Sequence, residues 1–157
     1  MQRVNLFDIE FDNYDFGDLL AFMDEAIRRR DQSYIVTCNV DHLIKLRKDA
    51  EFQQVYSNAG AVVADGMPIV WASKMLRKPL KTKVSGSDLF AKLGPAFEHR
   101  QYRLFFLGSE RGVPEQAMRN LKASYPQLNI VGCYSPSYGF EQKEDENRRI
   151  VDMLIDV

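Results

Sequence analysis

Short apolar runs alternate with longer segments of helical periodicity along most of the chain. Residues 61–64, Ala-Val-Val-Ala, are small or β-branched, which is typical of a buried strand. The runs at 33–38, 102–107 and 128–133 have similar character, and a segment with apolar residues at helical spacing follows each of them. Strands that alternate with helices predict a parallel sheet covered on both faces. We therefore expect an α/β fold of the doubly wound, Rossmann-like class.

The remaining pattern places the other elements. Residues 4–11 alternate imperfectly, which predicts one strand or a short hairpin at a sheet edge. Helices are expected over about residues 15–30, 41–57, 68–77, 87–98, 114–124 and 143–155. Asn39 or Asp41 can cap the second of these, and Ser87 the fourth. The inward candidates of the helix at 68–77 are Ile69, Val70, Ala72 and Met75.

The end of the chain changes the expected domain organisation. We expect one domain over residues 1–157, because no linker or repeat interrupts the pattern. The helix at 143–155 has the apolar face of a crossover, and a right-handed crossover normally returns to a further parallel strand. We therefore expect the chain to lack a C-terminal segment; the alternative is a terminal helix that packs on the sheet. An unfinished edge or an uncovered apolar face favours a homo-oligomer.

Composition excludes several classes of function. The net charge is −1, which gives no support to a nucleic-acid binder. Cys38 and Cys133 lie far apart in predicted strand ends, so reduced thiols in the cytoplasm are expected rather than a disulfide framework. We see no signal peptide, and no apolar run approaches the ~20 residues that span a bilayer. A peripheral role at a membrane stays open.

Asp65 is the polar position that stands out, because it directly follows the apolar run at 61–64 and precedes Gly66-Met67-Pro68. Gly66 allows a tight turn and Pro68 suits the first turn of a helix. Asp65 is therefore expected at the carboxyl end of a strand, where open α/β sheets bind ligands. A carboxylate that is partly removed from water at such a position suits a general base. The alternative is a helix cap, and spacing alone does not decide between the two.

Polar groups follow two other predicted strands. Thr37 and Asn39 offer a hydroxyl and an amide that could orient a sugar or a phosphate, with helix capping as the equal alternative. The turn at Gly108-Ser109 is a candidate nucleotide cradle, because glycine lets the backbone approach a ligand and the next helix points amide donors at it. This turn has neither the lysine of a P-loop nor the glycine spacing of a dinucleotide fingerprint.

Each charged cluster could bind a ligand or could have an ordinary structural role. A basic run comprises Lys74, Arg77, Lys78, Lys81 and Lys83. It could attract a diphosphate or an anionic membrane face, or it could be a solvated surface. The arginines at 28–30 are either a phosphate patch or cations that complement the helix dipole. His42 and His99 have no metal-ligand partner at useful spacing, so we expect structural or solvent-facing roles for them and no metal site.

Several of these segments together resemble one family. The segments at 37–41 (Thr-Cys-Asn-Val-Asp), 64–70 (Ala-Asp-Gly-Met-Pro-Ile-Val) and 84–89 (Val-Ser-Gly-Ser-Asp-Leu) are similar to the signature of the WecG/TagA/CpsF glycosyltransferases. The later Phe106-Leu107-Gly108-Ser109, Tyr125-Pro126 and Ile130-Val131-Gly132 resemble the same pattern. The resemblance covers about residues 4–155.

The resemblance implies an inverting, metal-independent glycosyltransferase without a cofactor. It would move an N-acetylhexosamine-type sugar, such as N-acetylmannosamine or its uronic acid, from a UDP-sugar donor to a polyprenyl-diphosphate-linked sugar. The protein would be peripheral at the cytoplasmic face of the bacterial membrane and would serve teichoic acid, common-antigen or capsule-like polymer synthesis. Asp65 would be the general base. The implied substrate-binding residues are Thr37, Asn39, Gly66, Met67, Lys83, Gly86, Asp88, Gly108 and Ser109.

The sequence departs from the family pattern in three places. Lys83 stands where arginine is expected, which keeps the charge but loses bidentate phosphate geometry. Ser109 stands where a second glycine is usual, and the family's Gly-x-Pro-x-Gln-Glu block would lie beyond Val157. Two alternatives stay open: a non-catalytic nucleotide-sugar-binding module of a polysaccharide assembly complex, and an unrelated α/β enzyme with a nucleotide cofactor.

Overall fold

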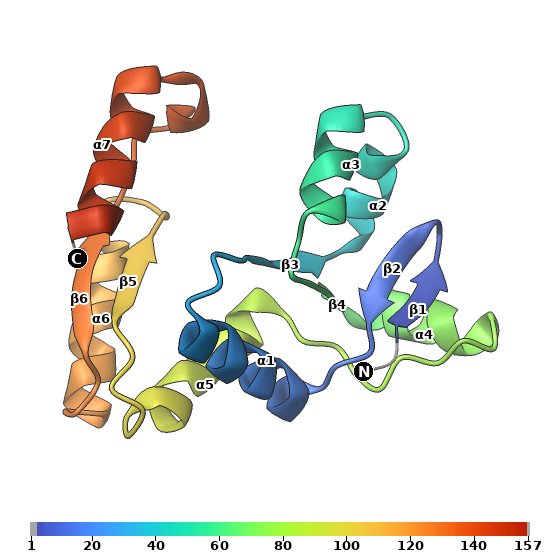
Figure 1. Ribbon diagram of the computed structural model, residues 1–157, viewed down its shortest axis with the longest axis horizontal. Helices are drawn as coiled ribbons and strands as arrows, with labels where there is room; N and C mark the ends of the chain where they lie inside the picture. The colour runs from blue at the N-terminus through green and yellow to red at the C-terminus, as the bar shows by residue number, and fades with distance from the viewer. Residues whose placement is uncertain (1–2, 157) are drawn as a thin grey trace. The chain divides into compact units, whose positions relative to one another are not determined.

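The computed structural model describes residues 3–156, in two compact units that divide between Ala91 and Lys92 (Figure 1). The described residues of the first unit form two strand pairs, and those of the second form one. The single domain expected over residues 1–157 stays a prediction, and its outermost residues, 1–2 and 157, lie outside the described part.

The first unit begins with an antiparallel hairpin of β1 (Arg3–Leu6) and β2 (Ile9–Asp12). Phe7 and Asp8 form its turn, and both have positive φ, 57° and 64°. Two such residues in succession match the right-handed twist of the strands, as in a type I′ turn. The hairpin alternative for residues 4–11 is therefore confirmed. Its buried apolar residues are Val4, Leu6, Ile9 and Phe11.

A parallel pair of β3 (Ile35–Cys38) and β4 (Ala61–Ala64) forms the centre of this unit. All four β4 side chains are buried, and successive side chains point to opposite faces of a strand. One face carries Val62 and Ala64, which belong to the same apolar cluster as Phe11 of the hairpin. The other face carries Ala61 and Val63.

Helices cover both faces of this pair. The Val62 face packs against α2 (Val40–Leu46), α3 (Ala50–Ser57) and α4 (Met67–Met75). The Val63 face packs against α1 (Phe16–Arg29). Figure 1 shows α2 and α3 on one side of the strands and α1 on the other. The expected α/β fold, with parallel strands between helices, is confirmed.

Two expectations about helices are wrong. The segment at 41–57 forms two helices instead of one, because Asp49 starts a new helix: its Oδ1 accepts a hydrogen bond from Phe52 N–H at 2.9 Å. In α4, Ile69 and Val70 are buried as expected, but Met75 is 85% exposed. The helix therefore has apolar residues on its outer face as well as on its inner one.

The edge of β4 that faces away from β3 obtains hydrogen-bond partners from the last residue of β2 and from Val84, which lies outside regular strands. The buried Asp12 accepts a hydrogen bond from Val62 N–H through Oδ2, at 2.9 Å. The other oxygen of Asp12 pairs with Arg3 Nε at 3.0 Å. Further along the edge, Val84 N–H donates to the Ala64 carbonyl at 2.8 Å. The Val62 N–H and the Ala64 carbonyl are thus satisfied, as buried polar groups require.

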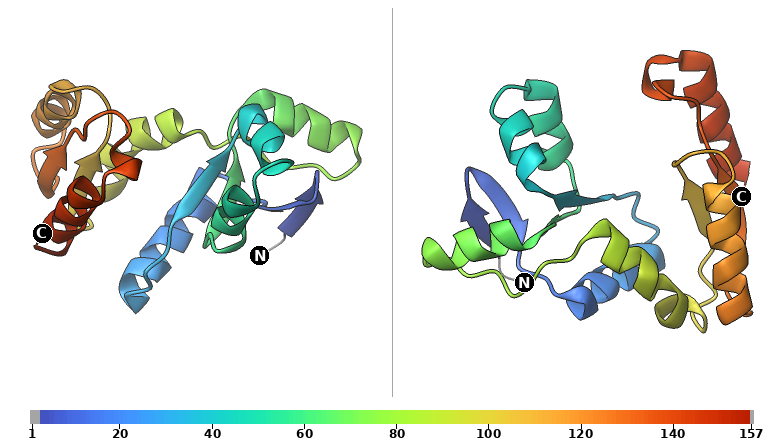
Figure 2. Two further views of the ribbon diagram at one scale, coloured as in Figure 1. Left: turned by 90° about the horizontal axis from the view of Figure 1, so that it is seen from above. Right: turned by 180° about the vertical axis from the view of Figure 1, so that it is seen from behind.

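The second unit has a parallel pair of its own, β5 (Leu104–Leu107) and β6 (Ile130–Tyr134) (Figure 2). The helix α5 (Gly86–Phe97) leads into it from the first unit, and α6 (Val113–Ser124) connects the two strands. A short 3₁₀ helix, η1 (Phe140–Gln142), and α7 (Glu144–Asp156) follow β6. The strands expected at 102–107 and 128–133 are therefore confirmed as a parallel pair.

We predict that Asp12→Ala lowers the free energy of unfolding by about 2–3 kcal/mol, because it leaves the Val62 N–H buried without an acceptor. Urea denaturation followed by circular dichroism measures this change. Asp31→Ala is the matched control, since Asp31 is an exposed loop residue, and we expect a change within about 0.5 kcal/mol for it. Equal stability of the two variants would contradict the role given to Asp12.

Candidate active site at the carboxyl end of the first strand pair

Asn39 and Asp65 lie side by side because β3 and β4 end in the same register. Cys38 is opposite Ala64 in the parallel ladder, so each strand's next residue is the first beyond the pair. Asp65 N–H extends the ladder by one step and donates to the Cys38 carbonyl at 2.7 Å. The carboxyl end of parallel strands is the edge at which open α/β sheets bind ligands.

A third segment follows the other side of β4 to the same edge. The hydrogen bond from Val84 to the Ala64 carbonyl brings residues 84–86 beside Asp65. Gly86 faces Thr37: a Cβ on Gly86 would lie 3.9 Å from Thr37 Oγ1. The structure thus brings Thr37, Asn39 and Asp65 together within the first unit, as the sequence predicts for neighbouring strands, and places Gly86 beside Thr37.

The carboxylate of Asp65 makes no stabilising interaction with the described residues. The N-cap of α4 is Gly66, and no side chain makes a capping hydrogen bond there, so the capping alternative for Asp65 is wrong. No hydrogen bond or ion pair to its carboxylate occurs within residues 3–156. Asp65 is half-buried rather than sealed in the interior. The carboxylate is therefore placed to accept a proton from a ligand.

Asn39 has the structural role that sequence spacing left open. Its Oδ1 accepts a hydrogen bond from His42 N–H at 2.9 Å and caps α2. The cap fixes the side chain's orientation and leaves the Nδ2 donor without a partner among the described residues. Thr37 is different, because it lies inside β3 and caps no helix. Thr37 is half-buried, and its hydroxyl faces Gly86.

The turn after Asp65 requires glycine. Gly66 has φ 109° and ψ 143°, a conformation that residues with a Cβ rarely adopt. Met67 begins α4 directly after this turn and is 37% exposed. Because the chain turns at Gly66, Asp65 stays at the end of β4 and is not part of α4.

The start of α5 forms the third wall of the site. Ser85, not the predicted Ser87, caps this helix, since its Oγ accepts a hydrogen bond from Asp88 N–H at 3.2 Å. Lys83 Nζ pairs with Asp88 Oδ2 at 2.6 Å, so the two expected ligand-binding residues bind each other. Sequence reasoning missed Ser85, although the Ser-x-x-Asp spacing of residues 85–88 signals a helix start.

A buried layer of side chains lies beneath this edge, and sequence reasoning did not find it. Tyr56 is buried, and its hydroxyl lies 2.7 Å from His42 Nδ1. Burial raises the pKa of the Cys38 thiol to about 11, a hydrogen bond from Tyr56 opposes the shift, and the Asp65 charge adds to it. Cys38 is a neutral, free thiol at physiological pH. This layer packs beneath the strand end that carries Asp65.

The histidine, cysteine and basic-run expectations have clear outcomes. His42 packs edge-on against Phe52 and His99 is exposed, so their expected structural and solvent-facing roles are confirmed. Both cysteines are free, as expected.

Three of the five cations of the basic run at 74–83 have structural partners. Lys78 donates to the Asn5 carbonyl, Lys81 pairs with Asp18, and Lys83 pairs with Asp88. Arg28 and Arg29 pair with Glu25 on their own helix, which favours the simple alternative for that triplet.

The Gly108-Ser109 turn belongs to the second unit. Gly108 has φ 115° and donates its N–H to the Tyr134 carbonyl at 3.0 Å. Ser109 has φ 68°, a conformation that favours glycine, the residue that the family resemblance leads us to expect there. The N-cap of α6, Gly112, makes no side-chain capping hydrogen bond, and the first amide of the helix, Val113 N–H, donates to the Glu110 carbonyl at 3.1 Å. The role of this turn in nucleotide binding stays a prediction.

A hollow of the first unit with a volume of about 750 Å³ lies elsewhere. It runs between the β1–β2 hairpin and the α2–α3 pair, and Phe7, Leu46 and Tyr56 are among its lining residues. Neither Asp65 nor Asn39 lines it. The candidate site is therefore an open strand edge rather than this hollow, which is the competing place for a ligand on the same unit.

We predict that Gly66→Ala lowers the free energy of unfolding by about 1–3 kcal/mol, because alanine is strained at this φ and ψ. Gly86→Ala is the matched control at the same site. Its new Cβ would make an ordinary contact with Thr37 at 3.9 Å, so we expect stability within about 1 kcal/mol of the unchanged chain. Thermal unfolding of both variants tests the pair, and equal losses would show that the turn is not the constraint.

Comparison with known proteins gives a consistent family. The sequence profile described as "Glycosyl transferase WecG/TagA/CpsF family" matches residues 4–156. A protein of Bacillus spizizenii is 30% identical over 112 residues, which is 71% of this chain and 43% of the relative. Its name is N-acetylglucosaminyldiphosphoundecaprenol N-acetyl-beta-D-mannosaminyltransferase.

Two further relatives have the same name. One, from Bacillus subtilis, is 23% identical over 139 residues, 88% of this chain and 54% of the relative. Another, from Staphylococcus aureus, is 24% identical over 146 residues, 92% of this chain and 56% of the relative. The chain thus spans about half the length of the curated relatives that it matches.

Proposed function

Because the chain belongs to the WecG/TagA/CpsF family of glycosyl transferases, we propose that it transfers an N-acetylhexosamine-type sugar in the synthesis of a bacterial cell-surface polymer. The names of the relatives support N-acetylmannosamine as the sugar and an N-acetylglucosamine on a polyprenyl diphosphate as the acceptor. We further propose a UDP-sugar as the donor and a transfer that needs no metal ion.

The proposed reaction is a single displacement with inversion. The acceptor hydroxyl attacks the anomeric carbon of the donor sugar, and the bond from that carbon to the diphosphate oxygen breaks on the opposite face. The electron pair of the broken bond leaves with UDP. The hydroxyl proton goes to Asp65, which acts as the general base. One carboxylate is sufficient for this chemistry, because no covalent intermediate forms.

The departing diphosphate needs hydrogen-bond donors or positive charge. Gly86 and Ser87 are exposed residues at the start of α5, and their amides can supply donors, since Ser85 caps the Asp88 amide. Lys83 can supply charge if its pair with Asp88 opens, and both side chains are more than a third exposed. Asn39 Nδ2 and the Thr37 hydroxyl are then left for the sugar.

We propose that transfer takes place at the cytoplasmic membrane face, where a polyprenyl-linked acceptor has its head group. No helix within residues 3–156 has the length and apolar character to cross a bilayer. The observation that carries the proposed function is the carboxylate of Asp65: it lies at the strand end beside Asn39 and Gly86, and no described residue binds it.

We predict that Asp65→Asn lowers the turnover number for sugar transfer by about 10²–10⁴-fold, because the amide cannot accept the acceptor proton. Transfer is measured from UDP-N-acetylmannosamine to N-acetylglucosamine linked to a polyprenyl diphosphate. Binding of UDP is measured in parallel by calorimetry, and we expect its Kd to stay within about threefold, since the change removes a base and not a phosphate ligand.

Asp31→Asn is the matched control, because Asp31 is exposed in the loop before β3. We expect its turnover to equal that of the unchanged chain. Equal turnover of Asp65→Asn would remove Asp65 as the base. Binding of UDP without transfer, even by a protein that includes the expected C-terminal segment, would instead support a nucleotide-sugar-binding module.

A further inference from the structure

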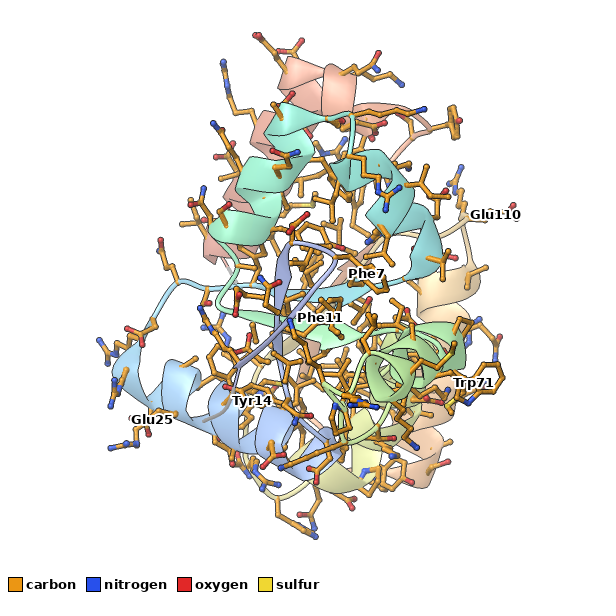
Figure 3. All side chains as sticks on the ribbon, turned by 90° about the vertical axis from the view of Figure 1, so that its right-hand side faces the viewer. Phe7, Phe11, Tyr14, Glu25, Trp71 and Glu110 are labelled. Carbon is orange, nitrogen blue, oxygen red and sulfur yellow. The ribbon has the colours of Figure 1, made fainter. Side chains whose placement is uncertain are left out.

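The exposed face of α4 carries an apolar stripe. Met67, Trp71 and Met75 are spaced four residues apart and therefore lie on one side of the helix. They are 37%, 58% and 85% exposed. Ile69 and Val70 fill the opposite side and are buried in the core, so this stripe is not needed for packing. Figure 3 shows Trp71 at the outer surface of the helix, pointing away from the body of the first unit.

Positive charge accompanies the stripe. Lys74 lies on the same side of the helix and Arg77 follows its end, and neither has an ion-pair partner among the described residues. The sequence from Gly66 to Ser87 contains no aspartate or glutamate. The surface around the stripe therefore combines exposed apolar side chains with cations that no nearby acid on the same segment balances.

This combination fits one class of partner. Tryptophan and methionine beside lysine and arginine are typical of surfaces that enter the head-group region of an anionic bilayer. A second copy of the same face would bring its unbalanced cations against those of the first copy, which is unfavourable. We propose that the α4 stripe, Met67, Trp71 and Met75 with Lys74 and Arg77, is the surface by which the chain binds anionic lipid.

The stripe also begins at the candidate site. Met67 is two residues after Asp65, and the Gly66 turn is all that separates them. A helix lying in the head-group plane would hold the carboxylate at the level of a lipid-linked diphosphate. This consequence rests on the proposed function, whereas binding of the stripe to anionic lipid does not.

Trp71 is the single tryptophan of the chain, so its fluorescence reports on the stripe alone. We predict that vesicles of phosphatidylcholine with phosphatidylglycerol shift its emission to shorter wavelength and protect it from acrylamide. Vesicles of pure phosphatidylcholine should have a much smaller effect, and added salt should reverse the shift because it screens Lys74 and Arg77.

Variants separate the apolar and the charged parts of the surface. Trp71→Ala should weaken co-sedimentation with the phosphatidylglycerol vesicles about tenfold, since a large apolar side chain no longer enters the lipid. Tyr138→Ala is the matched control, because Tyr138 is a fully exposed aromatic residue outside the stripe, and its binding should be unchanged. The double variant Lys74→Glu, Arg77→Glu should lose the preference for phosphatidylglycerol.

Two results would overturn the proposal. One is an unchanged tryptophan spectrum at saturating phosphatidylglycerol vesicles. The other is an emission shift that depends on protein concentration without vesicles, which would show that a second copy covers the stripe. The vesicles hold neither donor nor acceptor sugar, so failure of sugar transfer would leave lipid binding intact, and failure of lipid binding would leave the role of Asp65 intact.

Discussion

The first unit is built around β4, a strand that is buried on both faces and has hydrogen-bond partners along both edges. All four side chains of β4 are buried between α1 and the cluster that contains α4. One edge of the strand pairs with β3, and the other receives the Asp12 carboxylate and the Val84 amide. The Val62 N–H and the Ala64 carbonyl on this edge therefore both have partners within the fold. The first position at which a free polar side chain can stand is directly after it, and that position is Asp65.

The burial of all four β4 side chains explains why the position of Asp65 could be predicted from the sequence. The residues that stabilise the strand from other parts of the chain could not be predicted in this way. The apolar run at 61–64 followed by Asp-Gly-x-Pro indicates a strand end and then a turn. The positions of Asp65 at the strand end and of Gly66 in the turn could therefore be predicted from the sequence. Asp12 acts through Val62, fifty residues away, and no local pattern signals such a contact. The prediction that Asn39 or Asp41 caps a helix was correct for Asn39, whereas the break at Asp49 was missed because apolar periodicity continues across it.

The error at Met75 has a different physical origin. Periodicity shows that α4 is apolar at several positions, but it does not tell which of two apolar faces the core takes. The structure assigns Ile69 and Val70 to the core and leaves Met75 outside. Exposing the second apolar face of a helix to water is unfavourable. For this reason we assign a binding role to the outer face of α4. That the same helix begins at the candidate site joins the two features in one surface.

The central claim is that one ligand site is formed by the ends of β3 and β4 together with the start of α5. Titration of the isotope-labelled chain with UDP, followed by amide NMR, tests it most directly. We predict that the signals of residues 37–39, 65–67 and 83–88 shift together along one binding curve. Shifts confined to the hollow between the β1–β2 hairpin and the α2–α3 pair, with those three segments unchanged, would contradict the account.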